Sequence, residues 1–96
     1  MATFEHAVLF CKENCAPCLN TKKFIAEKVP NDLLAGLSIL QKEKQTALVE
    51  LYGLELYPTL LILDKEGHEI DRCVGGKNIR ANITQFLTEI FYARCI

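Results

Sequence analysis

Two short apolar runs constrain the fold of this chain most strongly, because a water-soluble chain must bury such runs. They are His6–Cys11 (HAVLFC) and Thr59–Leu63 (TLLIL). Apolar runs of five or six residues bounded by turn residues are typical of buried strands. The turn-like Lys12-Glu13-Asn14 follows the first run, and Asp64-Lys65-Glu66-Gly67 follows the second. We therefore expect the first run to be a buried strand and the second a central strand.

Two segments between these runs have the periodicity of helices. Ala16–Val29 can place four apolar side chains on one face, and Pro30-Asn31-Asp32 stops it. Those side chains are Cys18, Phe24, Ile25 and Val29. Gln45–Tyr52 is the second segment, and Gly53 is a plausible C-terminal stop for it. Its apolar positions at helical spacing are Ala47, Leu48 and Leu51.

The remaining elements complete an α/β pattern. Leu37–Leu40 predicts a short strand, and Glu69–Val74 predicts the second arm of a hairpin. Gly75-Gly76 breaks the chain, and Asn78 is expected to be the N-cap of the last helix. The apolar stripe of that helix consists of Ile79, Ile83, Phe86, Leu87, Ile90 and Phe91. The order β-α-β-α-β-β-α predicts a four-stranded mixed sheet flanked by three helices.

Length and charge narrow the function classes. The 96 residues suit one small domain, expected to span residues 1–96. The net charge of −1 comes from 11 basic and 12 acidic residues, without the basic stripe of a nucleic-acid or membrane-surface protein. The apolar runs are too short to cross a bilayer. Five cysteines, an odd number, and an N-terminus without the pattern of a secretory signal predict a cytoplasmic protein.

Three cysteines lie close together in "FCKENCAPCLN", at Cys11, Cys15 and Cys18. The complete C-x-x-x-C-x-x-C run can hold an iron–sulfur cluster, whereas its second half can be a reversible dithiol. In the predicted frame Cys15 lies between a strand and a helix, where free N–H groups and the helix dipole favour a thiolate. Cys18 is one helical turn away and can donate a hydrogen bond to Cys15, then close a disulfide. A C-x-x-C at this position of a βαβ pattern predicts a redox motif.

The motif Cys15-Ala16-Pro17-Cys18 resembles the active site of the thioredoxin family, in which a small residue and a proline separate the cysteines. The stretch "YGLELYPTLLILDKEGHEIDRCVGG" is similar to the thioredoxin segment that carries the cis-proline, the hairpin and the following glycine. The resemblance covers roughly residues 6–93. It implies that Cys15 attacks and Cys18 resolves, that Pro58 is the cis-proline, that Tyr57 offers its backbone to substrate, and that Gly75 shapes the groove.

The sequence also departs from the thioredoxin pattern. Asn14 stands where the family has tryptophan, and Leu9 stands where the family has a buried acid, so no proton relay from that carboxylate to Cys18 is expected. Only five residues precede His6, which makes the frame similar in size to glutaredoxins. The run Gly75-Gly76-Lys77-Asn78 also resembles their glycine-pair glutathione motif, which adds Gly76 to the expected substrate-binding residues.

The resemblance implies reversible dithiol–disulfide exchange without a metal or an organic cofactor. The expected partners are protein disulfides and an electron donor, either a thioredoxin reductase or glutathione. We expect a monomer that binds neither nucleic acid nor membrane. Two alternatives remain: an iron–sulfur carrier that ligates a cluster through Cys15 and glutathione across a dimer, and a binding module with vestigial cysteines. The three-cysteine run also resembles the radical-SAM cluster motif, but Cys11 is expected to end a buried strand.

A few chemically versatile residues stand outside this scheme. Lys12, three residues before Cys15, could stabilise a thiolate or bind an anionic substrate, although a plain surface lysine is the simpler interpretation. His6 and His68 have no Cys or His at metal-ligand spacing and are expected to face solvent. Cys73 and Cys95 are interpreted as a strand residue and a terminal residue, with a regulatory or dimer-bridging disulfide as the alternative.

Overall fold

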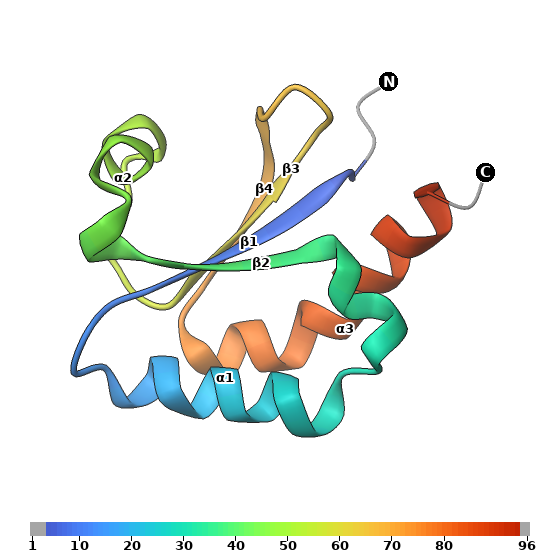
Figure 1. Ribbon diagram of the computed structural model, residues 1–96, viewed down its shortest axis with the longest axis horizontal. Coiled ribbons are helices and arrows are strands. Elements are labelled where there is room, and N and C mark those ends of the chain that lie inside the picture. The colour runs from blue at the N-terminus through green and yellow to red at the C-terminus, as the bar shows by residue number, and fades with distance from the viewer. Residues whose placement is uncertain (1–3, 95–96) are drawn as a thin grey trace.

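A four-stranded mixed sheet, in the order β2-β1-β3-β4, forms the centre of the computed structural model, which describes residues 4–94 (Figure 1). Its strands are β1 (His6–Cys11), β2 (Leu37–Gln41), β3 (Thr59–Leu63) and β4 (Glu69–Val74). Strand β1 pairs in parallel with β2 and antiparallel with β3, and β4 pairs antiparallel with β3. The α/β fold class and the order of strands and helices agree with the prediction.

Three α-helices and two short 3-10 turns surround the sheet. The helices are α1 (Ala16–Lys28), α2 (Thr46–Tyr52) and α3 (Gly76–Arg94), and the turns are η1 (Asn31–Gly36) and η2 (Lys42–Lys44). Helices α1 and α3 lie side by side on one face of the sheet, and α2 lies on the other (Figure 1). The two 3-10 turns were not predicted, because segments this short leave no periodic pattern.

The core has two parts, one on each face of the sheet. Successive side chains of a strand point to opposite faces, so Leu9 packs into the larger cluster with α1 and α3, whereas Val8 and Phe10 pack into the smaller cluster beside α2. Every residue of β1 except His6 is buried. This double coverage explains why the run shows no polar alternation.

Helix α3 joins the sheet to α1 through one buried stripe. Its fully buried side chains are Ile79, Ile83, Leu87 and Ile90. Each such side chain contributes roughly 1.5–3 kcal/mol when removed from water. Because these positions recur every three or four residues, the sequence pattern identified this helix correctly, although Phe86 of the predicted stripe is only partly buried and Phe91 is 37% exposed.

The start of α3 differs from the prediction. The helix begins at Gly76, so Asn78 lies inside its first turn and is not the N-cap. The amide of Asn78 instead donates to the carbonyl of Val74 at 3.4 Å. The chain reverses earlier because Gly75 adopts a φ of 91°, a conformation that residues with a side chain rarely adopt.

Helix α2 buries a different face from the predicted one. Leu51 is 72% exposed and Ala47 is exposed as well, whereas Leu48, Val49 and Tyr52 pack against the smaller cluster. Seven residues make only two turns, so the tertiary contacts rather than the pattern decide which side faces the sheet. Gly53, at a φ of 61°, caps the helix as predicted.

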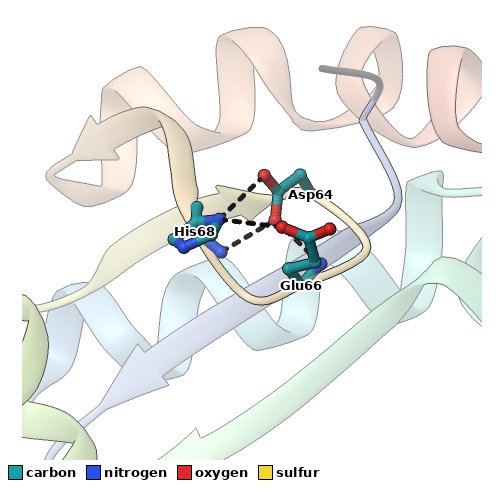
Figure 2. Close-up of side chains that lie close together, drawn as sticks. All are labelled: Asp64, Glu66 and His68. Carbon is teal, nitrogen blue, oxygen red and sulfur yellow. Dashed lines mark hydrogen bonds and ion pairs between the residues drawn. The ribbon is translucent and has the colours of Figure 1, made fainter. Parts of the chain in front are cut away.

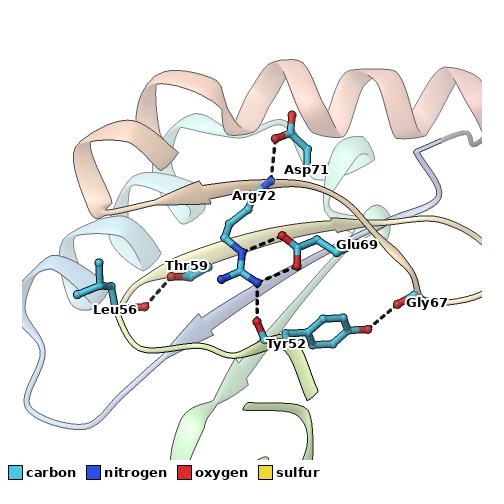
Figure 3. Close-up of polar contacts among 7 residues, drawn as sticks. All are labelled: Tyr52, Leu56, Thr59, Gly67, Glu69, Asp71 and Arg72. Atoms are coloured by element: carbon cyan, nitrogen blue, oxygen red, sulfur yellow. Dashed lines mark hydrogen bonds and ion pairs between the residues drawn. The ribbon is translucent and has the colours of Figure 1, made fainter. Parts of the chain in front are cut away.

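Strand β4 holds the end of α2 through a polar network (Figure 3). The Arg72 guanidinium binds both carboxylate oxygens of Glu69 and also donates to the carbonyl of Tyr52, the last residue of α2. The Tyr52 hydroxyl donates to the carbonyl of Gly67 at 2.6 Å. The loop that follows α2 therefore starts from an anchored point.

Asp64 organises the hairpin turn between β3 and β4 (Figure 2). One of its carboxylate oxygens accepts the backbone N–H groups of Glu66 and His68, at 2.9 and 2.8 Å. The N–H of His68 contributes most to holding the pKa of Asp64 below its usual value, against partial desolvation, and Glu66 adds to it. His68 itself is exposed, as predicted.

His6 differs from the expectation of a solvent-facing side chain. It is half-buried, and its Nε2 lies 2.9 Å from the hydroxyl of Ser38 on the neighbouring strand. Burial, together with the nearby Arg94 charge, lowers the pKa of His6, and Glu5 opposes this shift. No helix within residues 4–94 is long and apolar enough to cross a membrane.

Candidate active site

Cys15 and Cys18 are joined by a disulfide at the N-terminus of α1. Cys15 is the N-cap, in an extended conformation, and its Sγ accepts the backbone N–H of Cys18 at 3.2 Å. The chain enters the helix through Asn14, at a φ of 54°, a left-handed conformation that asparagine tolerates better than most residues. Pro17 lies in the first helical turn, where its missing N–H leaves no bond unmade.

The disulfide is shielded from solvent, although the residues between its two cysteines are exposed. Cys15 is 5% exposed and Cys18 is 1% exposed. The two residues between them, Ala16 and Pro17, are exposed. The pair thus belongs to the larger core cluster, and the two residues between the cysteines separate it from water.

The segment opposite the disulfide is Tyr57–Pro58. The peptide bond between these residues is cis, as predicted. The carbonyl oxygen of Tyr57 lies 4.0 Å from the Sγ of Cys15, and the buried Pro58 accepts the N–H of Gly75 at 2.9 Å. The structure therefore brings four residues together that the sequence analysis selected from separate parts of the chain.

Hydrogen bonds also hold the loop that leads to Pro58. The hydroxyl of the buried Thr59 donates to the carbonyl of Leu56 at 2.6 Å (Figure 3). The Tyr57 hydroxyl lies 3.4 Å from the carbonyl of Leu54 and donates to it. These bonds, with the Arg72 anchor on α2, hold the loop on both sides of Tyr57.

The two glycines after β4 have different surroundings. A Cβ added to Gly75 would meet nothing within 4 Å, so only its positive φ requires glycine. A Cβ added to Gly76 would lie 2.9 Å from the flexible end of the Arg80 side chain, 3.0 Å from the Thr21 hydroxyl and 3.3 Å from the Pro17 carbonyl oxygen. Packing of α3 against the first turns of α1 therefore accounts for Gly76, which is buried.

The core around Cys18 is apolar where the resemblance would place an acid. Leu9 is 0% exposed and belongs to the same buried cluster as Cys15 and Cys18. The nearby polar group is the buried hydroxyl of Thr21, which donates to the Pro17 carbonyl at 2.8 Å. In residues 4–94, no buried side-chain nitrogen or oxygen lacks a hydrogen-bond partner.

Cys11 and Cys73 are buried free thiols of the same cluster. Burial raises the pKa of Cys11, and the charge of Lys22 offsets part of this effect. Burial also raises the pKa of Cys73, a hydrogen bond from Asn82 lowers it, and the charge of Asp71 raises it further. Both thiols are therefore poor nucleophiles. Cys95 lies outside the described residues.

The position of Cys11 is relevant to the hypothesis that Cys11, Cys15 and Cys18 together hold an iron–sulfur cluster. It forms the last residue of β1, and Cys15 and Cys18 are bonded to each other. Among the described residues, the one group with three candidate ligand atoms within 4.8 Å of one another is Asp64, Glu66 and His68 (Figure 2). That group is explained by the hydrogen bonds of the hairpin turn.

Sequence reasoning missed two charged residues beside the site, Lys42 and Glu43 in η2. The Lys42 ammonium lies 5.2 Å from the centre of the Tyr57 ring. A carboxylate oxygen of Glu43 lies 3.3 Å from the backbone nitrogen of Glu13 and accepts its hydrogen bond. Lys12, which the sequence analysis did select, is exposed.

The pairing of β1 with β2 could have indicated that η2 lies beside the site. Parallel strands end at the same edge of a sheet, and Cys11 at the end of β1 is in register with Gln41 at the end of β2. The residues after Gln41 must therefore lie beside the loop that carries Cys15.

Comparison with solved structures identifies the fold. Over 88% of this chain and 78% of the other, the germline-specific thioredoxin Deadhead from Drosophila melanogaster superimposes with a TM-score of 0.69 at 16% sequence identity. An oxidised thioredoxin from Plasmodium falciparum gives a TM-score of 0.67 at 17% identity, over 90% of this chain and 80% of the other. A thioredoxin from Thermus thermophilus gives 0.64 at 22% identity, over 88% and 71%.

Sequence comparison alone finds no such relationship. No protein-family model matches the chain, and no curated protein sequence matches it. The similarity in three dimensions extends over nine-tenths of the chain. The chain therefore has the thioredoxin fold.

Proposed function

We propose that the protein is a member of the thioredoxin family and reduces protein disulfides by dithiol exchange. One observation carries this proposal: a bonded pair of cysteines lies at the N-terminus of a helix, against the cis Tyr57–Pro58 segment. The thioredoxin fold of the chain supports it. The catalytic residues are Cys15 and Cys18.

In the first step, the reduced Cys15 thiolate attacks one sulfur of a substrate disulfide. A bond forms between Cys15 and that sulfur, and the other substrate sulfur leaves as a thiolate that takes up a proton. The N–H of Cys18, 3.2 Å from the Cys15 sulfur, and the helix dipole stabilise the attacking thiolate. The dipole supplies ~0.3–1 kcal/mol at an exposed helix end, so the direct hydrogen bond is needed as well.

In the second step, Cys18 loses its proton and attacks the sulfur of Cys15. The bond between the two cysteines forms, the mixed disulfide breaks, and the second substrate sulfur leaves as a thiolate. Two electrons pass to the substrate and the protein ends as the observed disulfide. Because Leu9 supplies no carboxylate, the proton of Cys18 passes to solvent.

Tyr57, Pro58 and Gly75 form the substrate-facing side of the site. The Tyr57 carbonyl points toward Cys15, so an extended substrate segment that presents a disulfide to Cys15 meets the backbone of this loop. The hydrogen bond between Gly75 and Pro58 joins the loop to the start of α3. Gly76 lets the start of α3 pack closely against α1, next to this surface.

Pro17, Ala16 and Lys12 tune the cysteine pair. Pro17 stiffens the first helical turn without adding charge, and the exposed Lys12 favours the thiolate through its charge. We place the reduction potential between about −270 mV, typical of thioredoxin, and about −200 mV, typical of glutaredoxins, nearer the thioredoxin end. We propose that the protein acts as a cytoplasmic monomer and that a thioredoxin reductase returns it to the dithiol form.

The test is insulin reduction with NADPH and either thioredoxin reductase or glutathione with its reductase. The wild-type protein should reduce insulin faster with thioredoxin reductase, whereas Cys15→Ser should be inactive with both systems. Cys73→Ser is the matched control, because it removes a buried thiol outside the motif and should retain activity. A wild-type protein that reduces no disulfide with either donor contradicts the proposal, and faster reduction with glutathione contradicts the choice of donor.

A further inference from the structure

The 3-10 turn η2 contacts both segments that carry the disulfide site. Glu43 bonds to the loop before Cys15, and Lys42 lies over the ring of Tyr57 on the opposite segment. Both contacts come from adjacent residues of one three-residue turn. Such a turn can determine how far apart the two segments lie.

The Glu43 carboxylate is well held although it is exposed. Its Oε2 accepts the backbone N–H of Glu13 at 3.3 Å. Partial desolvation alone would raise the pKa of Glu43, but the neighbouring N–H groups of Glu43 and Glu13, the side chain of Gln41 and the Lys42 charge hold it below its usual value. An ionised acceptor makes a stronger hydrogen bond than a neutral one, and Glu13 is two residues before Cys15, whose sulfur attacks.

The Lys42 contact acts on the other side of the site. An ammonium 5.2 Å from the centre of an aromatic ring is within the range of a cation–π interaction. The ring belongs to Tyr57, whose carbonyl oxygen lies 4.0 Å from the Cys15 sulfur. Fixing this ring therefore limits the rotation of the residue that faces the sulfur.

We propose that η2 is a positioning element of the site, in which Glu43 holds the loop before Cys15 and Lys42 holds Tyr57. Neither residue touches the reacting sulfurs, so both act through the residues that they hold. The effect of η2 on catalysis rests on the proposed function, whereas its effect on the loop does not. Two measurements separate these parts.

The first measurement is amide hydrogen exchange at Glu13 in the oxidised protein. Glu43→Ala removes the acceptor of this N–H, whereas Glu43→Gln keeps an acceptor oxygen without the charge. We expect Glu43→Ala to speed exchange at Glu13 by about fivefold to tenfold and Glu43→Gln to restore at least half of the protection on a logarithmic scale. Glu50→Ala, an exposed acid on α2, is the control and should leave Glu13 unchanged. Unchanged exchange in Glu43→Ala overturns the proposal, whether or not the protein reduces disulfides.

The second measurement is the rate at which Cys15 forms a mixed disulfide with a small aromatic disulfide. We expect Glu43→Ala to slow this step by about two- to fivefold and Glu43→Gln to restore it, because a displaced loop misaligns the sulfur. Lys42→Met should slow it similarly, and Lys42→Arg should restore it because arginine retains the cation–π contact. Equal rates in Glu43→Ala and Glu43→Gln, or in Lys42→Met and Lys42→Arg, contradict a positioning role. A wild-type protein without exchange activity refutes the proposed function but leaves the result at Glu13 valid.

Discussion

Replacing Leu9 by aspartate tests the account of proton transfer, because Leu9 occupies the core beneath the cysteine pair. The free-energy cost follows from its burial. Removing a fully buried leucine costs roughly 3–5 kcal/mol, and burying an unpaired neutral carboxyl adds ~1–3 kcal/mol. The sum of about 4–8 kcal/mol is large against the roughly 5–14 kcal/mol expected for a domain of 96 residues.

The cost depends on pH with a definite sign. Burial raises the folded pKa of an aspartate at position 9 above the unfolded value of ~3.9. The variant is therefore most stable below pH ~3.9 and loses about 1.4 kcal/mol per pH unit until the pH passes the folded pKa. Between pH 5 and pH 7 the loss is about 2.7 kcal/mol. Leu9→Asn has similar packing without an ionisable group and should lack this slope.

The assay is urea unfolding of Leu9→Asp and Leu9→Asn at several pH values, followed by single-turnover kinetics. An osmolyte such as trimethylamine N-oxide is added to favour the folded state of both variants at pH 7, and the kinetics are compared only where both are folded. In the folded state, Leu9→Asp should resolve a mixed disulfide faster than Leu9→Asn, because it supplies Cys18 with an internal base. Equal rates in two folded variants would mean that another group already accepts this proton, with Glu13 the next to test. A stability of Leu9→Asp that does not change with pH would refute the burial argument.

Three further predictions follow from the packing. Gly76→Ala should lower the free energy of unfolding by about 1–3 kcal/mol in urea, because its Cβ would crowd the Thr21 hydroxyl; a more stable variant would contradict this contact. Cys11 and Cys73 should react with iodoacetamide at pH 8 only on unfolding, as read by mass spectrometry, because burial raises the pKa of both thiols; rapid labelling of either in the folded protein would disagree. Because folding lowers the pKa of His6, the contribution of neutral His6 to the free energy of unfolding is fully present above pH ~6.5 and is lost as the pH falls through the folded pKa. His6→Gln should remove this part of the pH dependence of urea unfolding.

Elements with a strong local signal were predicted to within a residue. Strands β1, β3 and β4 have the predicted bounds, because each is bounded by turn residues. The first helix was predicted to end at Val29, and the structure ends it at Lys28 with Val29 as the C-cap. Helix ends fray, so differences of this size are expected.

The failures have a common cause, which is that tertiary contacts outweighed the local pattern. Asn78 is a good N-cap residue, but the positive φ of Gly75 and the close approach of Gly76 to α1 allow α3 to begin three residues earlier than an N-cap at Asn78 would. Leu51 fits an apolar stripe, yet the anchoring of Tyr52 by Arg72 turns it toward solvent. These contacts join residues far apart in the chain, and one sequence does not reveal them.

The residues of the candidate site also differ in how well the sequence predicted them. Cys15 and Cys18 were found because a short motif specifies them, and Pro58 because a long segment resembles the thioredoxin pattern. Lys42 and Glu43 belong to no motif and act through a sheet register that the sequence shows only indirectly. Residues that hold a site in place are therefore harder to predict than the residues that react.

Trapping of a mixed disulfide tests the central claim most directly. Each single cysteine variant is incubated in the reduced form with a protein disulfide, and the products are separated without reducing agent. Cys18→Ser should accumulate a stable mixed disulfide through Cys15, and Cys15→Ser should accumulate none, because Cys18 is buried. Stable adducts on Cys18 in Cys15→Ser would reverse the assignment, and the absence of any adduct in Cys18→Ser would contradict dithiol exchange at this site.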